Sequence, residues 1–135
     1  MKKKSIFKWF VVTVIFCPVV FSACKQEPAT QKRIIVTDIP AMHNGRFAVI
    51  ALIDTDYPIA GNRIPSPISN GTTTISLVDP TDGFTSFTES GTFKVLFWIT
   101  DSANETNYYS GVIFSKSITD ETTIIRFSEF INAGS

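Results

Sequence analysis

The chain has 135 residues, of which 44% are hydrophobic and 13% aromatic, and it balances 12 basic against 12 acidic side chains. Four of the basic side chains lie in residues 1–8, so the rest of the chain is mildly acidic, which argues against nucleic acid and anionic lipid headgroups as main partners, because both need clustered cations. With 2 cysteines and 1 histidine, the chain also has few groups for metal binding or thiol chemistry.

The first 23 residues have the layout of a secretory signal. Residues 1–8 carry four lysines and no acid, and residues 9–21 are apolar except for Thr13. This apolar run of about 13 residues is too short to span a bilayer, which needs about 20. We therefore expect residues 1–23 to be a cleaved signal peptide.

Two small residues, Ser22 and Ala23, directly precede Cys24, and Phe21 stands at the third position before the cysteine. The segment resembles the signal of bacterial lipoproteins, whose cleavage leaves the cysteine as the new N-terminus with diacylglycerol on its sulfur. The resemblance implies lipid attachment at Cys24, with Phe21, Ser22 and Ala23 as the recognition residues. Acyl chains such as palmitate hold such a protein on its membrane, since each buried methylene contributes about 0.8 kcal/mol.

Lys25, and not Asp, follows the cysteine. In many Gram-negative bacteria this permits export of a lipoprotein, so we expect an envelope location at the outer membrane or cell surface. The alternatives are an ordinary cleaved signal and an uncleaved apolar anchor, with Cys24 incidental in both.

Without residues 1–23 the chain keeps 8 basic and 12 acidic side chains, a formal charge of −4. We therefore expect no nucleic-acid partner.

The remaining chain predicts a tether at residues 24–31, one β-domain at residues 32–131 and a short tail at residues 132–135. Segment 56–70 is long for a loop, and residues 62–64 are a candidate edge strand within it. The fold class we expect is all-β, an antiparallel β-sandwich of six to seven strands, immunoglobulin-like or transthyretin-like, with a small barrel as the alternative. Runs rich in β-branched and aromatic residues predict the main strands, at residues 33–39, 46–54, 72–78, 92–100, 108–116 and 122–130.

Two of these strands are apolar on both faces. In residues 46–54, alternate positions such as Val49 and Ile50 are both apolar, and in residues 92–100 Trp98 lies on the face opposite to the phenylalanines. Strands of this kind are central strands that carry packing on each side. We therefore expect something to cover both faces of the sheet that contains them.

An Ile-Pro strand end at Pro40 is followed by Asn44-Gly45-Arg46-Phe47-Ala48, and Asn44-Gly45 predicts a hairpin-like connection between the first two strands. Later come Gly71-Thr72-Thr73 and Ser90-Gly91-Thr92. This order resembles a module of small spirochaetal, especially treponemal, lipoproteins, over most of residues 33–130. The resemblance implies a lipoprotein domain of unassigned role and supplies no functional residue.

The sequence offers little for catalysis or metal binding. His43 is the single histidine and is expected to be an exposed turn residue, which argues against a catalytic triad and against zinc. Asp54 and Asp56 form an Asp-x-Asp that could bind calcium, although such pairs usually only solvate a loop. We expect no cofactor, no catalytic residue and no enzyme, with a hydrolase using two carboxylates as a remaining alternative.

If the six main strands alternate up and down, residues 41–45, 79–91 and 117–121 share the end far from the membrane. The predicted binding residues on this rim are Met42, His43, Phe84 and Phe87, because exposed aromatic side chains often anchor partners. In the alternative interpretation Phe84 and Phe87 plug the end of the sandwich. An extra strand near Asn62 also moves the later loops to the opposite ends.

The sequence therefore favours a non-catalytic binding or adhesion module with a protein or glycan partner. The alternative is a structural subunit of an envelope complex. The hydroxyl-rich strand at residues 72–76 is the candidate for the unpaired sheet edge that such a subunit needs.

Overall fold

The structure is a computed structural model that describes residues 30–133. The predicted signal peptide, its recognition residues Phe21, Ser22 and Ala23, and Cys24 lie outside the described residues. The described chain forms strands joined by loops and two single-turn 3-10 helices, η1 (Ala41–His43) and η2 (Phe127–Glu129). The strands are β1 (Arg33–Thr37), β2 (Phe47–Asp54), β3 (Tyr57–Gly61), β4 (Ser66–Pro67), β5 (Thr73–Ser76), β6 (Gly91–Thr100), β7 (Asn107–Ile118), β8 (Thr122–Arg126) and β9 (Ile131–Asn132).

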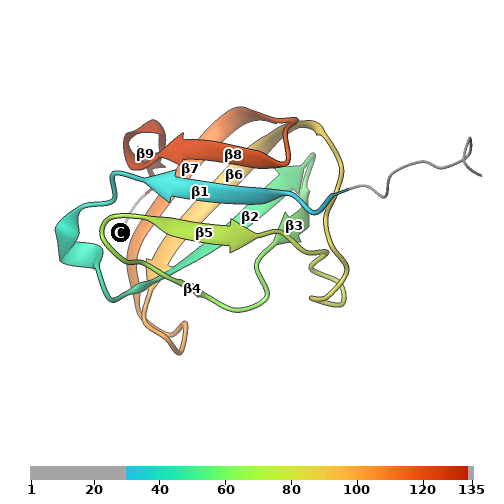
Figure 1. The fold of residues 1–135 in the computed structure, drawn as a ribbon. Coiled ribbons are helices and arrows are strands. Elements are labelled where there is room, and N and C mark those ends of the chain that lie inside the picture. Colours follow the sequence, from blue (N-terminus) through green and yellow to red (C-terminus); the bar gives the residue numbers. More distant parts are fainter. Residues whose placement is uncertain (1–29, 134–135) are drawn as a thin grey trace, which may run out of the picture.

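The strands form two packed sheets (Figure 1). The three-stranded sheet has the order β5-β1-β8, and the six-stranded sheet has the order β3-β2-β6-β7-β9, with β4 also paired to β2. All pairs are antiparallel except β1 and β8, which run parallel with Ile35 opposite Ile124. The predicted all-β sandwich is confirmed.

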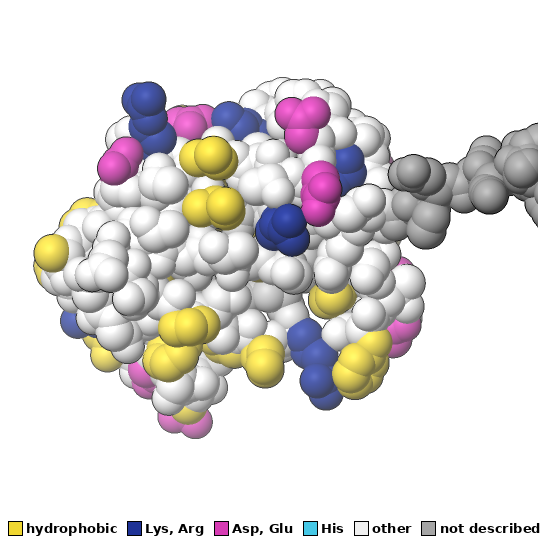
Figure 2. Space-filling view, viewed as in Figure 1, with side chains coloured by type: hydrophobic (Ala, Val, Ile, Leu, Met, Phe, Trp, Pro, Cys, Tyr) yellow, Lys and Arg dark blue, Asp and Glu magenta, His cyan; other side chains and the backbone are white. Residues whose placement is uncertain are grey.

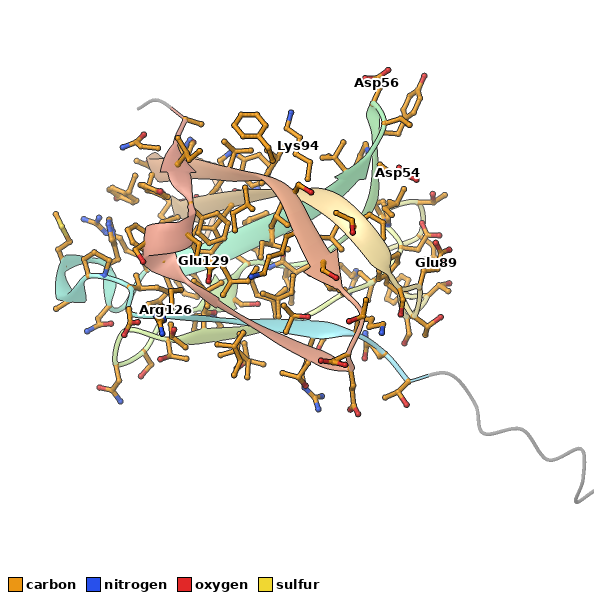
Figure 3. All side chains as sticks on the ribbon, turned by 90° about the horizontal axis from the view of Figure 1, so that it is seen from above. Asp54, Asp56, Glu89, Lys94, Arg126 and Glu129 are labelled. Atoms are coloured by element: carbon orange, nitrogen blue, oxygen red, sulfur yellow. The ribbon has the colours of Figure 1, made fainter. Side chains whose placement is uncertain are left out.

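The hydrophobic core lies between the two sheets. Because side chains alternate between the faces of a strand, Ile34 and Val36 of β1 point inward with Ile125 of β8, and all three have no exposed surface. From the other sheet, Ile50 and Phe97 meet them. Figure 3 shows side chains filling the space between the sheets. Each fully buried side chain of this kind stabilises the fold by about 1.5–3 kcal/mol.

The long segment between β2 and β5 contains the expected additional strand pairing, but the predicted position was wrong. Residues 62–64 form the gap between β3 and β4 instead of a strand. The Asn62 side chain fills this gap, because its Oδ1 accepts from the Ile50 N–H at 2.9 Å and its Nδ2 donates to the Ala48 carbonyl at 2.9 Å. One side chain thus replaces the missing backbone partner of β2.

The predicted hairpin between the first two strands was also wrong. Strands β1 and β2 belong to different sheets, so residues 38–46 cross from one sheet to the other. Gly45 does take a positive φ of 90°, as a turn residue can, but its N–H donates to the carbonyl of Ile68 at 2.9 Å. The N–H of Ile39 likewise donates to the carbonyl of Gly71 at 3.0 Å. The connection is therefore held by the chain around the β4–β5 turn.

The additional pairing at β3 and β4 decides which loops share an end of the sandwich. We call the end where residues 30–31 lead into β1 the tether end, and the opposite end the distal end (Figure 1). The Lys32 N–H donates to the Phe87 carbonyl at 2.8 Å, and the Lys32 Nζ donates to the Thr119 carbonyl at 2.7 Å. Residues 77–90 and 117–121 therefore lie at the tether end.

The distal end carries residues 38–46, 101–106 and 127–130. The predicted common rim of residues 41–45, 79–91 and 117–121 is therefore wrong. The physical reason is the additional strand pairing after β2. Because β3 and β4 run antiparallel to β2, the chain returns to the distal end before β5 begins, and the later loops lie at the ends opposite to those predicted. The sheet extends to β9, where Asn132 pairs with Gly111 of β7.

We expect Asn62→Ala to lower the free energy of unfolding by about 2 kcal/mol, since it leaves the backbone groups of Ile50 and Ala48 without partners inside the fold. Urea unfolding of the variant and the parent protein measures this. Asn62→Asp is the matched control, because it keeps the acceptor for Ile50 and should lose less. Equal midpoints for the parent and Asn62→Ala contradict the role given to this side chain.

Candidate functional site

The outer face of the six-stranded sheet, the side turned away from the three-stranded sheet, is the most unusual surface of the domain. A row of directly opposed residues crosses four strands on this face, from Ala51 through Leu96 and Val112 to Ile131. All four are apolar, whereas the solvated face of an antiparallel sheet normally carries polar side chains. Strands β2 and β6 therefore carry apolar side chains on both faces, as predicted. Of the two faces, only the inner one is covered by the other sheet among the described residues.

The apolar side chains of the outer face differ in how far they are exposed to solvent. Val112 is only 6% exposed although it lies outside the core between the sheets, so its neighbours on the outer face cover it. Ile131 and Phe114 remain 58% and 65% exposed. Lys94 reaches over the Phe114 ring at 5.6 Å, and Figure 3 shows Lys94 pointing away from the three-stranded sheet. None of the described strands packs on this face.

The three-stranded sheet presents a different outer face. Its side chains there include Thr74 and Ser76 of β5, both exposed, beside Ile35 of β1 and the 61% exposed Ile124 of β8. Figure 2 looks onto this side, where hydrophobic side chains form small separate groups among polar surface. The continuous apolar row is therefore a feature of the six-stranded sheet.

A pocket of about 300 Å³ lies at the distal end of the outer face. Its wall on the sheet is made by Val49 and Trp98, which are directly opposed in β2 and β6, together with Thr100. Its other wall comes from the loop after β6, through Asn104, Glu105, Thr106 and Asn107. The pocket thus joins an apolar surface to a polar loop, which is the usual composition of a small-ligand site.

The loop that forms the polar wall is held by its own hydrogen bonds. The Asp101 carboxylate accepts from the Glu105 N–H at 2.9 Å, and the Asp101 carbonyl accepts from the Asn104 N–H at 3.0 Å. The backbone hydrogen bond from Glu105 is the main reason why the pKa of Asp101 lies below its usual value. Asn104 takes a left-handed φ of 64°, which asparagine tolerates better than most residues. The loop geometry is therefore set before any ligand binds.

Several polar groups of the pocket have no protein partner. Thr100 is 2% exposed, and its Oγ1 makes no hydrogen bond with any described residue. A buried hydroxyl without a partner costs free energy and is uncommon in native folds. The side chains of Asn104 and Glu105 make no hydrogen bond within residues 30–133 either. The lining holds no lysine, arginine or histidine.

Met42 and His43 lie together in η1 at the distal end, but the expected exposure of His43 was wrong. Met42 is 71% exposed, whereas His43 is 6% exposed and its ring packs 6.3 Å from that of Phe127. Arg46 donates from Nη1 to the His43 Nδ1 at 3.1 Å, which requires an unprotonated Nδ1. Burial, and then the Arg46 charge, lower the pKa of His43 below its usual 6.5.

Phe84 and Phe87 lie at the tether end, so the structure does not bring the four predicted binding residues together. Phe87 is 5% exposed and packs edge-on against Phe93 at 6.0 Å, as the plug of the sandwich end that the alternative interpretation described. Phe84 is 68% exposed and carries the Arg63 guanidinium over its ring at 4.1 Å. Of this pair, only Phe84 is available at the surface.

A second pocket of about 300 Å³ lies beside Arg63 and Asp82 at the tether end. Here the Asp82 carboxylate is already committed to its own loop, because it accepts from Thr85 Oγ1 and from the N–H groups of Phe84 and Thr85. These hydrogen bonds, led by that of the Thr85 side chain, lower the pKa of Asp82 to about 2. The distal pocket, with its unpaired groups, is the better candidate site.

Asp54 and Asp56, the weak metal candidates, are exposed at the β2–β3 turn. Figure 3 shows Asp56 at the tip of this turn and Asp54 lower on the strand. Within the described part of the chain, no three His, Cys, Asp or Glu side chains form a group that could hold a metal ion. Among residues 30–133, no helix is long and apolar enough to cross a membrane.

Comparisons with protein-family models, with curated proteins and with solved structures find no match to this chain. The functional interpretation therefore rests on the chain's own residues. Sequence reasoning did not select Trp98 or the loop at residues 101–107 as a site. A signal was present, because Trp98 lies on the second apolar face of its strand and a run of polar residues follows two positions later.

We expect the free energy of unfolding to fall as the pH drops below about 6.5, with His43 as one cause. Because folding lowers the pKa of His43, its stabilising contribution is complete above the unfolded value of 6.5 and is lost as the pH falls towards the folded pKa. Urea unfolding of the parent and of His43→Gln at several pH values between about 7.5 and 5 measures the difference. An identical pH dependence in the two proteins contradicts this assignment.

Proposed function

We propose that the protein is a lipoprotein of the bacterial cell envelope, anchored through lipid on Cys24. The sandwich is a non-catalytic binding or adhesion module with a protein or glycan partner. The anchor is supported by the signal layout of residues 1–23 and the small residues before Cys24. Lys25 favours the outer membrane or cell surface as the location. A formal charge of −4 on residues 24–135 speaks against nucleic acid as the partner.

The observation that carries the binding role is the uncovered apolar face of the six-stranded sheet. Ile131 and Phe114 are 58% and 65% exposed on this face, beside the partly exposed Ala51 and Leu96, so apolar surface meets water there. Surfaces of this kind mark interaction sites in soluble domains. The pocket beside Trp98 adds polar groups that can fix the orientation of a partner.

The position of the tether agrees with this role. The described chain enters β1 at the tether end, whereas the pocket lies at the distal end (Figure 1). Seven tether residues, 25–31, reach at most about 25 Å when fully extended. The domain therefore stays near its membrane, and its binding pocket faces away from the point of attachment.

A structural subunit of an envelope complex is the second candidate. Strands β5 and β8 are the two edges of the three-stranded sheet, and the hydroxyl-rich strand named from the sequence is thus an edge strand. An edge strand offers backbone N–H and C=O groups to a strand of another chain. In this role the contact surface is a sheet edge and not the apolar outer face.

We expect a tagged fatty acid fed to the producing cells to label the wild-type protein and not Cys24→Ala. In the same cells, protease added outside should remove the domain, since a surface module is open to it. Gel fluorescence of the label and immunoblotting of the domain measure the two effects. A periplasmic protein that stays intact serves as the control for unbroken cells.

The outcomes separate the candidates. Label that persists in Cys24→Ala contradicts the anchor. Label that depends on Cys24, combined with a domain that survives the protease, contradicts surface exposure and favours the structural subunit.

A further inference from the structure

We propose that the pocket at the distal end of the outer face binds a neutral saccharide ring, with Trp98 as the stacking platform. This inference rests on the proposed function, because it names the class of partner for the binding module.

The apolar wall fits one face of a sugar ring. A pyranose carries several C–H groups on one face, which are weakly positive, while the face of an indole ring is negative. Trp98 is partly exposed and stands directly opposite Val49 in the sheet, and both residues line the pocket. They offer a flat apolar surface inside a volume of about 300 Å³, at the lower end of the range for ligand pockets.

The polar wall fits the hydroxyl groups around such a ring. A sugar hydroxyl both donates and accepts hydrogen bonds, and so does an amide or a threonine side chain. Asn104 offers an amide and Glu105 a carboxylate acceptor, both on exposed side chains whose backbone N–H groups make the hydrogen bonds to Asp101. The buried Thr100 hydroxyl lies in the same wall and has no partner among the described residues. Because the hydrogen bonds of Asp101 already fix this loop, little ordering is needed on binding.

The lining argues against charged ligands. An anionic sugar, a phosphate or a sulfate needs a cationic partner, and the pocket has none, while Glu105 repels a negative charge. A quaternary ammonium ligand could lie against Trp98 beside Glu105, but cages for such ligands use several aromatic rings. Trp98 is the single aromatic residue of the lining, and the amides and hydroxyls are left unused by an ammonium group. A neutral saccharide uses both walls.

Affinity for one sugar ring should be weak. At the usual ligand efficiency, a ligand of about a dozen heavy atoms reaches a dissociation constant of about 2 mM. Many copies anchored on one membrane can still hold a repeated glycan firmly through multivalency. Adhesion to a surface polysaccharide is thus compatible with a shallow pocket.

Tryptophan fluorescence gives a direct test. The chain has 2 tryptophans, Trp9 in the predicted signal and Trp98 in the pocket, so the full chain in a Trp9→Phe background reports on the pocket alone. We expect neutral oligosaccharides of hexoses and N-acetylhexosamines to change this fluorescence in a saturable way at millimolar concentration. Glucuronate and choline, titrated in parallel, should give no saturable change.

Variants locate the binding. Saturation-transfer NMR on the saccharide should show the strongest transfer to the C–H groups of one ring face, and Trp98→Ala should abolish it. Asn104→Gly removes the amide and keeps the left-handed φ of 64° at this exposed position, so it should weaken binding about tenfold, the equivalent of one good hydrogen bond. Thr74→Ala, on the exposed outer face of the three-stranded sheet, should leave saccharide binding unchanged.

Two results overturn the proposal. One is the absence of a saturable response to every neutral saccharide, and the other is a response to choline that Glu105→Gln removes, which assigns the pocket to a cationic ligand. Either result leaves the proposed function standing if the anchored protein still engages its envelope partner and Phe114→Ser weakens that contact. If Cys24→Ala still takes up the fatty-acid label, by contrast, the proposed anchor is overturned and the saccharide result is unaffected.

Discussion

The structure depends on two strands, β2 and β6, that are apolar on both faces. Their inner side chains, such as the directly paired Ile50 and Phe97, are covered by the three-stranded sheet and form the core. Their outer side chains, such as Val49 and Trp98, meet no second layer among the described residues. One pair of strands therefore both builds the fold and exposes an apolar surface, which a stable monomeric domain has no need to keep.

The sequence was sufficient for the fold class and for most strands, because period-2 alternation and turn residues are local signals. It failed where a side chain or a distant segment decides the outcome. Asn62 takes the place of a backbone partner, and no local pattern announces that. The hairpin signal at Asn44-Gly45 was overridden because Gly45 bonds to Ile68 in another part of the chain.

The candidate site was predicted less well than the fold, for a related reason. Met42, His43, Phe84 and Phe87 were grouped by an assumed strand order, and the pairing of β3 and β4 with β2 separates them to opposite ends. The distal pocket forms because β2 and β6 lie side by side and the loop after β6 folds over their outer face. The topology of the sheet decides which strands and loops become neighbours, and local patterns in a single sequence do not reveal it.

We propose that a partner covers the outer face of the six-stranded sheet. Cysteine labelling measures this most directly, with Lys94→Cys on that face and Thr74→Cys on the exposed face of the other sheet as the control. We expect a maleimide reagent to label Lys94→Cys much more slowly in native membranes than in the purified protein, while Thr74→Cys reacts alike in both. Equal labelling of Lys94→Cys in the two preparations would contradict it.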